Sequence, residues 1–370
     1  MNKIGIICEY NPFHNGHIYH IEKIKEMYPD SIIILVMSGN IVQRGDFSVL
    51  DKWDKTEIAL NYVDLVVELP SIFTIESADG FASGAITILK NLNVDTIVFG
   101  TETLNIDELI KIAKVQKQKK FDELTKSYLN QGINYPTALS KATYKLTNIK
   151  IEKPNDLLGL SYVKELIDTH IKPITIKRTN DYHSTKANCK IASATSIREN
   201  LKSKKSIKKY VPKETYNYLK NYKDKNYFEY LKYKIISEID NLNIYLNVDE
   251  GIENRIKKYI YECNNMGDLI DKIKTKRYTY NKIKRMLLCI LLGIGKNDNK
   301  NIEYIRVLGF NNKGKDYLKE VKNYVDIPII TNFTSKYKAL ELELKIAYIY
   351  YLNEKDKDYL IEYKHKPIIK

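Results

Sequence analysis

Short apolar runs that alternate with amphipathic stretches constrain the fold of this chain more than any other feature of its sequence. Within the first 100 residues, four such runs cover residues 4–9, 32–38, 65–69 and 96–100. Short runs that are apolar throughout are typical of strands buried on both faces. The stretches between them, residues 17–28, 52–62 and 78–92, have helical patterns. This alternation predicts an α/β fold with a doubly wound parallel sheet and helices on both of its faces.

The pattern changes after about residue 200. Before it, the sequence predicts peripheral helix over 107–150, a helix over 155–168, a strand over 173–178 and a helix that begins near Ser196. Beyond it, helical patterns dominate, at residues 216–222, 227–240, 251–263 and 282–292. Residues 202–209 contain five lysines and are the best candidate for a linker. We therefore predict two domains, residues 1–200 with the sheet and residues 201–370 with a mostly α-helical fold.

The net positive charge of the chain comes entirely from the residues after position 200. Residues 1–200 contain 24 basic and 24 acidic residues, whereas residues 201–370 contain 36 and 22, so the net charge of +14 belongs to the latter. Of the 30 tyrosines, 21 also lie after residue 200. Codon bias in an AT-rich genome would raise lysine throughout the chain and does not explain this asymmetry. A basic, tyrosine-rich domain beside a neutral one indicates binding of a polyanion such as RNA.

The sequence also predicts a cytoplasmic protein. The longest apolar run, residues 32–37, is far shorter than a membrane span. The N-terminus begins with a strand pattern and shows no signal-peptide pattern. The four cysteines are far apart and form no CxxC motif, which is typical of free thiols in a reducing compartment.

The strongest chemical signal is the segment from Tyr10 to His17, which follows the first predicted strand and opens the first predicted helix. This position is the carboxyl edge of a parallel sheet, where open α/β folds bind their ligands. A helix N-terminus offers free N–H groups to a phosphate, Gly16 permits close approach, and His14 and His17 can hydrogen-bond phosphate oxygens. A metal site formed with His20 and surface histidines without a function are the alternatives. Because a glycine between the histidines at such a turn is atypical of zinc helices, we predict no metal site.

A second segment, Ile191 to Arg198, repeats this arrangement. Ser193, Thr195 and Ser196 are residue types that cap helix N-termini, and they would leave N–H groups free for phosphates. Arg198 could neutralise a departing pyrophosphate. By itself, the segment could equally be an ordinary helix cap followed by a solvated arginine.

Together, the two segments resemble known signatures. His14-Asn15-Gly16-His17 resembles the HxGH signature of the nucleotidyltransferase superfamily, and residues 191–198 are similar to its ISSTxxR motif. The resemblance implies a Rossmann-like sheet. Residues 37–46, 99–102, 153–159 and 182–184 further resemble, in this order, the family of bacterial tRNA(Met) cytidine acetate ligases. The resemblance covers about residues 1–200, whereas the later part fits only by composition and length.

The resemblance implies a set of site residues. His14, His17 and Arg198 would be catalytic. The ATP site would comprise Ile7, Cys8, Glu9, Tyr10, Asn11, Pro12, Phe13, His14, Asn15, Gly16, His17, Ile18, Tyr19, His20, Gly100, Asn155, Arg178 and Ser196. Without the resemblance to this family, Gly100 could be a turn residue, Asn155 a helix cap and Arg178 a charged residue on the surface. The region of residues 38–44 is where we would look for the acetate pocket.

The family further implies an ATP-dependent ligase. Acetate and ATP would form acetyl-adenylate, from which the acetyl group passes to N4 of the wobble cytidine of elongator tRNA(Met), with Mg²⁺ as an expected helper. Lys276, Arg277 and Arg285 interleave with tyrosines and are our candidates for RNA binding, although a solvated basic helix end is the alternative. Two other functions use parts of the same pattern: a small-molecule adenylyltransferase of cofactor biosynthesis, and a noncatalytic RNA-binding protein.

Overall fold

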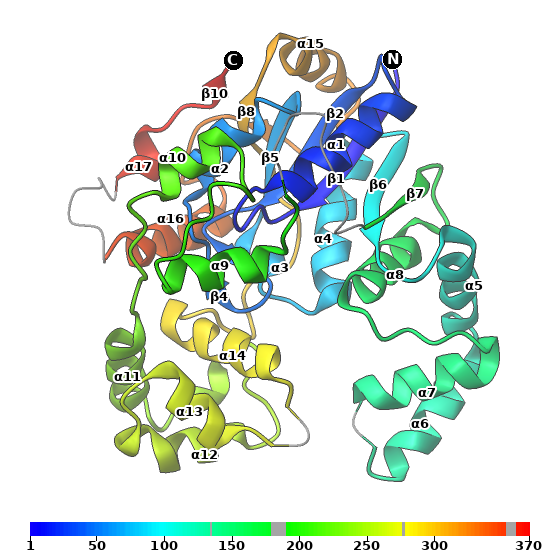
Figure 1. Ribbon diagram of the computed structural model, residues 1–370. Coiled ribbons are helices and arrows are strands. Elements are labelled where there is room, and N and C mark those ends of the chain that lie inside the picture. Colours follow the sequence, from blue (N-terminus) through cyan, green and yellow to red (C-terminus); the bar gives the residue numbers. More distant parts are fainter. Residues whose placement is uncertain (134, 179–189, 276–277, 353–359) are drawn as a thin grey trace.

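Five adjacent parallel strands form the larger part of the sheet in the computed structural model (Figure 1). They are β1 (Lys3–Cys8), β2 (Ile32–Ser38), β5 (Leu65–Leu69), β6 (Thr96–Thr101) and β7 (Lys172–Lys177). Their spatial order is β5-β2-β1-β6-β7, so the direction of winding reverses between β1 and β6. Ligands of open α/β sheets bind at this reversal, outside the carboxyl ends of the strands. The structure describes residues 1–133, 135–178, 190–275, 278–352 and 360–370.

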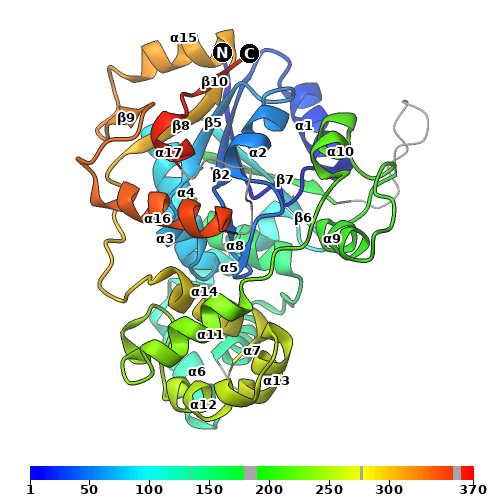
Figure 2. The ribbon, with the colours of Figure 1, turned by 90° about the vertical axis from the view of Figure 1, so that its left-hand side faces the viewer.

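Both faces of the sheet are covered by helices, as the sequence predicts. Alternate side chains of β2 enter two different cores: Ile32, Ile34 and Val36 belong to one, and Ile33, Leu35 and Met37 to the other. The first core includes side chains of α4 (Ala78–Asn91) and α8 (Pro154–Leu166), and the second includes side chains of α1 (Asn15–Met27) and α2 (Lys52–Ala59). Figure 2 shows α1 and α4 on opposite sides of the strands. Burial on both faces explains why these strands are apolar throughout.

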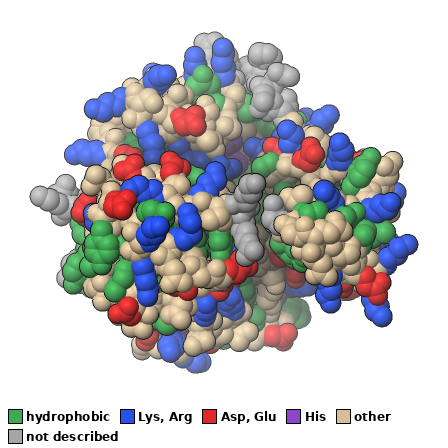
Figure 3. All heavy atoms as spheres, turned by 90° about the horizontal axis from the view of Figure 1, so that it is seen from below, with side chains coloured by type: hydrophobic (Ala, Val, Ile, Leu, Met, Phe, Trp, Pro, Cys, Tyr) green, Lys and Arg blue, Asp and Glu red, His purple; other side chains and the backbone are tan. Residues whose placement is uncertain are grey.

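Two groups of helices project beyond the carboxyl edge of the sheet (Figure 1). One contains α5 (Ile106–Gln116), α6 (Lys119–Asn130) and α7 (Tyr135–Thr147). The other, called the helical part below, spans residues 228–292 and contains α11 (Phe228–Ser237), η1 (Leu242–Ile244), α12 (Ile252–Tyr259), η2 (Ile260–Glu262), α13 (Met266–Ile273) and α14 (Tyr280–Leu292). Seen from below, the surface is hollowed between the two groups, and Lys and Arg side chains lie around the hollow (Figure 3).

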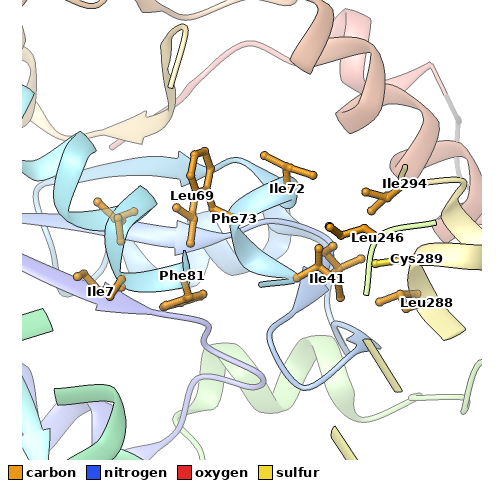
Figure 4. Close-up of a cluster of buried hydrophobic side chains, with 14 of the residues drawn as sticks. Ile7, Ile41, Leu69, Ile72, Phe73, Phe81, Leu246, Leu288, Cys289 and Ile294 are labelled. Atoms are coloured by element: carbon orange, nitrogen blue, oxygen red, sulfur yellow. The ribbon is translucent and has the colours of Figure 1, made fainter. Parts of the chain in front are cut away.

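Short elements connect these layers. The loop after β2 contains the antiparallel pair β3 (Ile41–Val42) and β4 (Asp46–Phe47), and α3 (Ser71–Thr74) follows β5. The helices α9 (Ala194–Lys202) and α10 (Lys213–Leu219) lead from the sheet to the helical part. Figure 4 shows Ile41 and Ile72 of the sheet side close to Leu246 and Leu288 of the helical part and to Ile294, two residues beyond it. All of these side chains belong to one buried cluster, so the two parts share a core.

The prediction that residues 201–370 form a separate helical domain is corrected by the end of the chain. After the helical part come β8 (Ile305–Phe310), α15 (Asn312–Val321), β9 (Ile329–Ile330), α16 (Lys338–Tyr351), α17 (Ile361–Lys364) and β10 (Ile368–Ile369). Strand β8 pairs antiparallel with β5, and β10 pairs parallel with β8, so this segment extends the sheet of the first domain.

Buried charges hold the returning segment in place. Lys52 Nζ lies 2.6 Å from Glu68 Oε1 and 2.5 Å from Glu362 Oε1. Arg306 Nη1 lies 2.7 Å from Glu362 Oε2 and 3.4 Å from Glu68 Oε2. The four side chains are at most 1% exposed and come from α2, β5, β8 and α17. Two cations and two anions therefore neutralise one another, which charges away from water require.

None of the helices that the structure describes is long and apolar enough to cross a membrane.

Candidate active site

His14 and His17 cap the N-terminus of α1 reciprocally. His14 is the N-cap residue, and its Nδ1 accepts a hydrogen bond of 3.0 Å from the N–H of Gly16. The Nδ1 of His17 accepts a bond of 3.2 Å from the N–H of His14. The two rings are stacked, with 3.8 Å between their centroids. Because each Nδ1 is an acceptor, each neutral ring carries its proton on Nε2, which becomes a hydrogen-bond donor.

Burial keeps these imidazoles neutral. Burial, together with the charges of Arg178 and Arg198, lowers the pKa of His14 to about 3. Burial also brings the pKa of His17 well below its usual value, with added repulsion from His14 and Arg178. The pKa of His20 is lowered to about 4, again mainly by burial. At neutral pH the histidines are thus uncharged donors, and the positive charge of the site resides in its arginines.

The loop before α1 is held by buried aromatic rings. The Tyr10 ring contacts the ring of Phe13 edge-on, with centroids 4.7 Å apart, and lies 4.6 Å from that of His17. The Oδ1 of Asn11 accepts a hydrogen bond of 2.8 Å from the N–H of Val49, which ties this loop to the one after β2. A Cβ on residue 16 would lie 2.9 Å from Cε1 of His14. Only a glycine at position 16 therefore leaves the His14 ring in place.

Arg198 joins the two sequence motifs in space. Ser193 is the N-cap of α9, and its Oγ accepts a hydrogen bond of 3.1 Å from the N–H of Ser196. The Nη1 of Arg198 donates to the carbonyl of Asn11 at 2.6 Å, and its Nη2 donates to Thr195 Oγ1 at 3.1 Å. The N-termini of α1 and α9 therefore meet. The N–H groups of Asn15, Gly16 and His17 already donate within the protein, so an anion at the α1 end would be held by side chains and by the positive end of the helix dipole.

Three further predicted residues lie around the carboxyl end of β6. Gly100 is within β6, and the N–H of Arg178, just after β7, donates to the carbonyl of Thr101 at 2.8 Å. A Cβ at position 100 would lie 3.1 Å from Cγ of Arg178, so this side chain crosses the strand beside the glycine. The N–H of Asn155, in the first turn of α8, donates to Glu102 Oε2 at 3.3 Å. The structure thus brings Gly100, Asn155 and Arg178 to one strand end.

Lys55 is a site residue that the sequence analysis did not identify. Its Nζ donates to the carbonyls of Glu9, Ser38 and Gly39 at 3.1, 2.7 and 2.7 Å. The side chain is fully buried, which lowers the pKa of Lys55 to about 8. It therefore fixes the carboxyl ends of β1 and β2 relative to each other. No sequence signal distinguishes it from the other lysines of amphipathic helices, because its partners are backbone atoms of distant strands.

The RNA-binding candidates have different positions. Lys276 and Arg277 lie outside the described residues, as do residues 182–184. Arg285 is half-buried at the contact between α14 and the loop after β2, where its Nη1 donates to the carbonyl of Gln43 at 3.4 Å. Burial lowers the pKa of Arg285, and Lys284 next to it pairs with Asp46. Arg285 is therefore not a solvated residue at a helix end, as the sequence would suggest.

Comparisons with known proteins agree with this geometry. Residues 1–363 match the family described as HIGH Nucleotidyl Transferase. The chain is 38% identical to the tRNA(Met) cytidine acetate ligase of Clostridium acetobutylicum, covering 100% of both chains. It is 40% identical to the protein of that name from a Geobacillus species, covering 90% of both.

A solved structure agrees as well. The crystal structure of Thermotoga maritima TmcAL bound with alpha-thio ATP superposes with a TM-score of 0.88 at 27% identity, covering 100% of this chain and 99% of the other. Since both the sequence and the fold match over essentially the whole chain, the protein belongs to the HIGH nucleotidyl transferase family and, within it, to the family of the tRNA(Met) cytidine acetate ligases.

Proposed function

We propose that this protein is an ATP-dependent ligase that acetylates N4 of the wobble cytidine of elongator tRNA(Met). The observation that carries the proposal is the pair of helix N-termini joined by Arg198 at the point where the sheet reverses its winding. Relatives named for this activity match the chain from end to end. A site of this kind binds a triphosphate, and the part of the chain after residue 200, which carries the net positive charge, surrounds it from several sides.

In the first step, a carboxylate oxygen of acetate attacks the α-phosphorus of ATP. The bond from that phosphorus to the α–β bridging oxygen breaks, and pyrophosphate leaves with the electron pair. The Nε2–H groups of His14 and His17 donate to phosphate oxygens as negative charge develops on them. Arg198 and Ser196 stabilise the departing pyrophosphate at the N-terminus of α9. Because both rings are neutral, they contribute hydrogen bonds to these oxygens, and the arginines contribute the positive charge.

In the second step, N4 of the cytidine attacks the acetyl carbonyl carbon. The bond from this carbon to the AMP oxygen breaks, AMP leaves, and the amine loses a proton to give N4-acetylcytidine. The acyl-adenylate is already activated, so the protein needs to contribute mainly positioning. The hollow at the carboxyl edge, between α5–α7 and the helical part, is where the anticodon loop would enter (Figure 3).

Mg²⁺ would enter with the nucleotide. Magnesium usually keeps several water ligands and binds substrate phosphates with few protein groups. Among the described residues there is no group of three or more His, Cys, Asp or Glu side chains that could hold a metal ion, which fits this mode of binding. The ion would supply further neutralisation of phosphate charge.

A small-molecule adenylyltransferase is the second candidate function, because it uses the same two helix N-termini. The 36 basic and 22 acidic residues after position 200 favour an RNA substrate instead.

Pyrophosphate release measured with acetate alone, with tRNA alone and with both separates the possibilities. The proposed ligase turns over only with both substrates and forms acetyl-adenylate once with acetate alone. Sustained turnover without RNA, driven by a small acceptor, would contradict the proposal, and so would a complete absence of ATP cleavage.

A further inference from the structure

Two arginines from distant parts of the chain converge on one hydroxyl group. The Nη1 of Arg44, in the loop after β2, donates to Thr195 Oγ1 at 3.1 Å. The Nη2 of Arg198 donates to the same oxygen, also at 3.1 Å. Thr195 lies in the first turn of α9, so both guanidinium groups stand beside the N–H groups of that turn.

This pair of cations has no direct counterion in the part of the chain that the structure describes. Their hydrogen bonds go to the Thr195 hydroxyl and to the carbonyl of Asn11, and neither guanidinium forms an ion pair with any residue that the structure describes. Among the carboxylates that act on Arg198 at longer range, Asp46 pairs with Lys284, and Glu9 accepts the N–H of Gln43 at 2.6 Å. Two neighbouring guanidinium groups repel each other, and an oxyanion between them would relieve that repulsion.

The loop that carries Arg44 is fixed on both sides of this residue. On one side, the N–H of Gln43 binds Glu9 and its carbonyl accepts from Arg285. On the other side, Gly45 has a φ of +79°, and a Cβ there would lie 2.3 Å from the backbone nitrogen of Arg285. Position 45 therefore has to be glycine, and α14 packs directly on the loop. Arg44 is held between two anchored neighbours while its own side chain reaches toward α9.

We propose that Arg44 is a further catalytic residue, which binds the β- and γ-phosphates of ATP together with Arg198 and stabilises the departing pyrophosphate. The inference rests on the proposed function and assigns to it a residue outside both signature motifs. As the bond between the α-phosphorus and the α–β bridging oxygen breaks, negative charge accumulates on the pyrophosphate. Two guanidinium groups can each donate two parallel hydrogen bonds to such a group.

The test compares Arg44→Ala and Arg44→Lys with Lys202→Ala. Lys202 is the last residue of α9 and forms an exposed pair with Asp224, so this control removes one positive charge far from the N-terminus of that helix and does not touch the site. Acetate-dependent exchange of labelled pyrophosphate into ATP, in the absence of RNA, measures the first step. We expect Arg44→Ala to slow the exchange about 10²-fold, a loss typical of one such donor, with partial rescue by lysine.

Binding provides a second measurement that does not depend on activity. Arg44→Ala should weaken the binding of ATP but leave that of AMP unchanged, because AMP lacks the β- and γ-phosphates. If the variant keeps wild-type exchange and ATP affinity and instead binds tRNA less tightly, Arg44 contacts RNA and the proposal is wrong. If the wild-type protein shows no acetate-dependent exchange, the proposed function fails, whereas the ATP and AMP affinities still test the role of Arg44.

Discussion

At the scale of single residues, the site depends on histidines that are kept uncharged. His14 and His17 each use Nδ1 to accept a backbone N–H, which leaves Nε2–H as the group available to a phosphate. Residue types and spacing in the sequence predict these two histidines and Arg198. Their protonation could not be predicted, because it results from burial among Tyr10, Phe13 and the arginines of distant segments.

The first prediction concerns His17. His17→Ala removes one donor from the α-phosphate and should lower the rate of acetyl-adenylate formation by about 10² or more. Affinity for tRNA should stay nearly the same, because the helical part is untouched. Rapid-quench measurement of acetyl-adenylate checks the loss of rate, and a filter-binding assay checks the affinity for tRNA. Equal losses in both would show that the variant is misfolded or that the two functions are not separate.

The second prediction concerns pH. His20 is neutral in the folded protein because burial lowers its pKa to about 4, whereas an unfolded histidine has a pKa of about 6.5. Between these two pKa values the unfolded chain binds more protons than the folded protein. The contribution of neutral His20 to the free energy of unfolding is therefore fully present above about pH 6.5 and is lost as the pH falls toward 4. His14 and His17 add to the same trend.

Urea unfolding from about pH 7 to about pH 5 measures this loss. His20→Phe should flatten the slope by up to one proton, about 1.4 kcal/mol per pH unit. An unchanged slope in this variant would mean that His20 is protonated in the folded state.

At the scale of elements, apolar runs predict the strands closely. The predicted and observed bounds of β2 and β5 coincide, because continuous burial on both faces leaves an unbroken apolar pattern. Helix α1 begins at Asn15, two residues earlier than expected, since His14 serves as its cap. Strand β8 was not predicted. Its run of six residues follows a long helical region, and its partner β5 lies about 240 residues earlier in the chain. Such long-range pairing leaves no local signal.

The third prediction concerns the basic segment before α14. If Lys276 and Arg277 contact tRNA phosphates, replacing both by alanine should lower the slope of log affinity against log salt by about 1 to 2. Arg285→Ala should change that slope little and instead reduce stability, because its guanidinium binds the carbonyl of Gln43. Titrations with tRNA at several salt concentrations, with thermal unfolding alongside, make the comparison. A slope lowered by Arg285→Ala alone would place this residue on the RNA surface.

At the scale of the whole molecule, the end of the chain adds strands to one edge of the sheet. The charge asymmetry of the sequence predicts an RNA-binding part, but it conceals that β8 and β10 belong to the sheet. The returning segment is joined to the sheet by the pairing of β8 with β5, by apolar side chains in the shared core and by the buried quartet of Lys52, Glu68, Arg306 and Glu362. These charged residues look like surface residues in the sequence, because their partners are far apart along the chain.

The fourth prediction follows from this quartet. Arg306→Met leaves the buried Glu68 and Glu362 carboxylates with one cation between them and should lower the free energy of unfolding by about 3–5 kcal/mol. Denaturant unfolding measures the change, and Lys319→Met, which breaks an exposed pair with Asp316, is the matched control, with an expected change below about 1 kcal/mol. Similar small effects of both substitutions would show that the quartet does not hold the C-terminal segment.

The central claim is that the protein activates acetate with ATP and transfers it to one cytidine of a tRNA. The most direct test incubates the protein with labelled acetate and two transcripts of elongator tRNA(Met), one unmodified and one with uridine in place of the wobble cytidine. Label should enter the first transcript only when ATP is present, and it should not enter the second. Label that enters RNA without ATP, that enters both transcripts equally, or that never enters RNA would contradict the account.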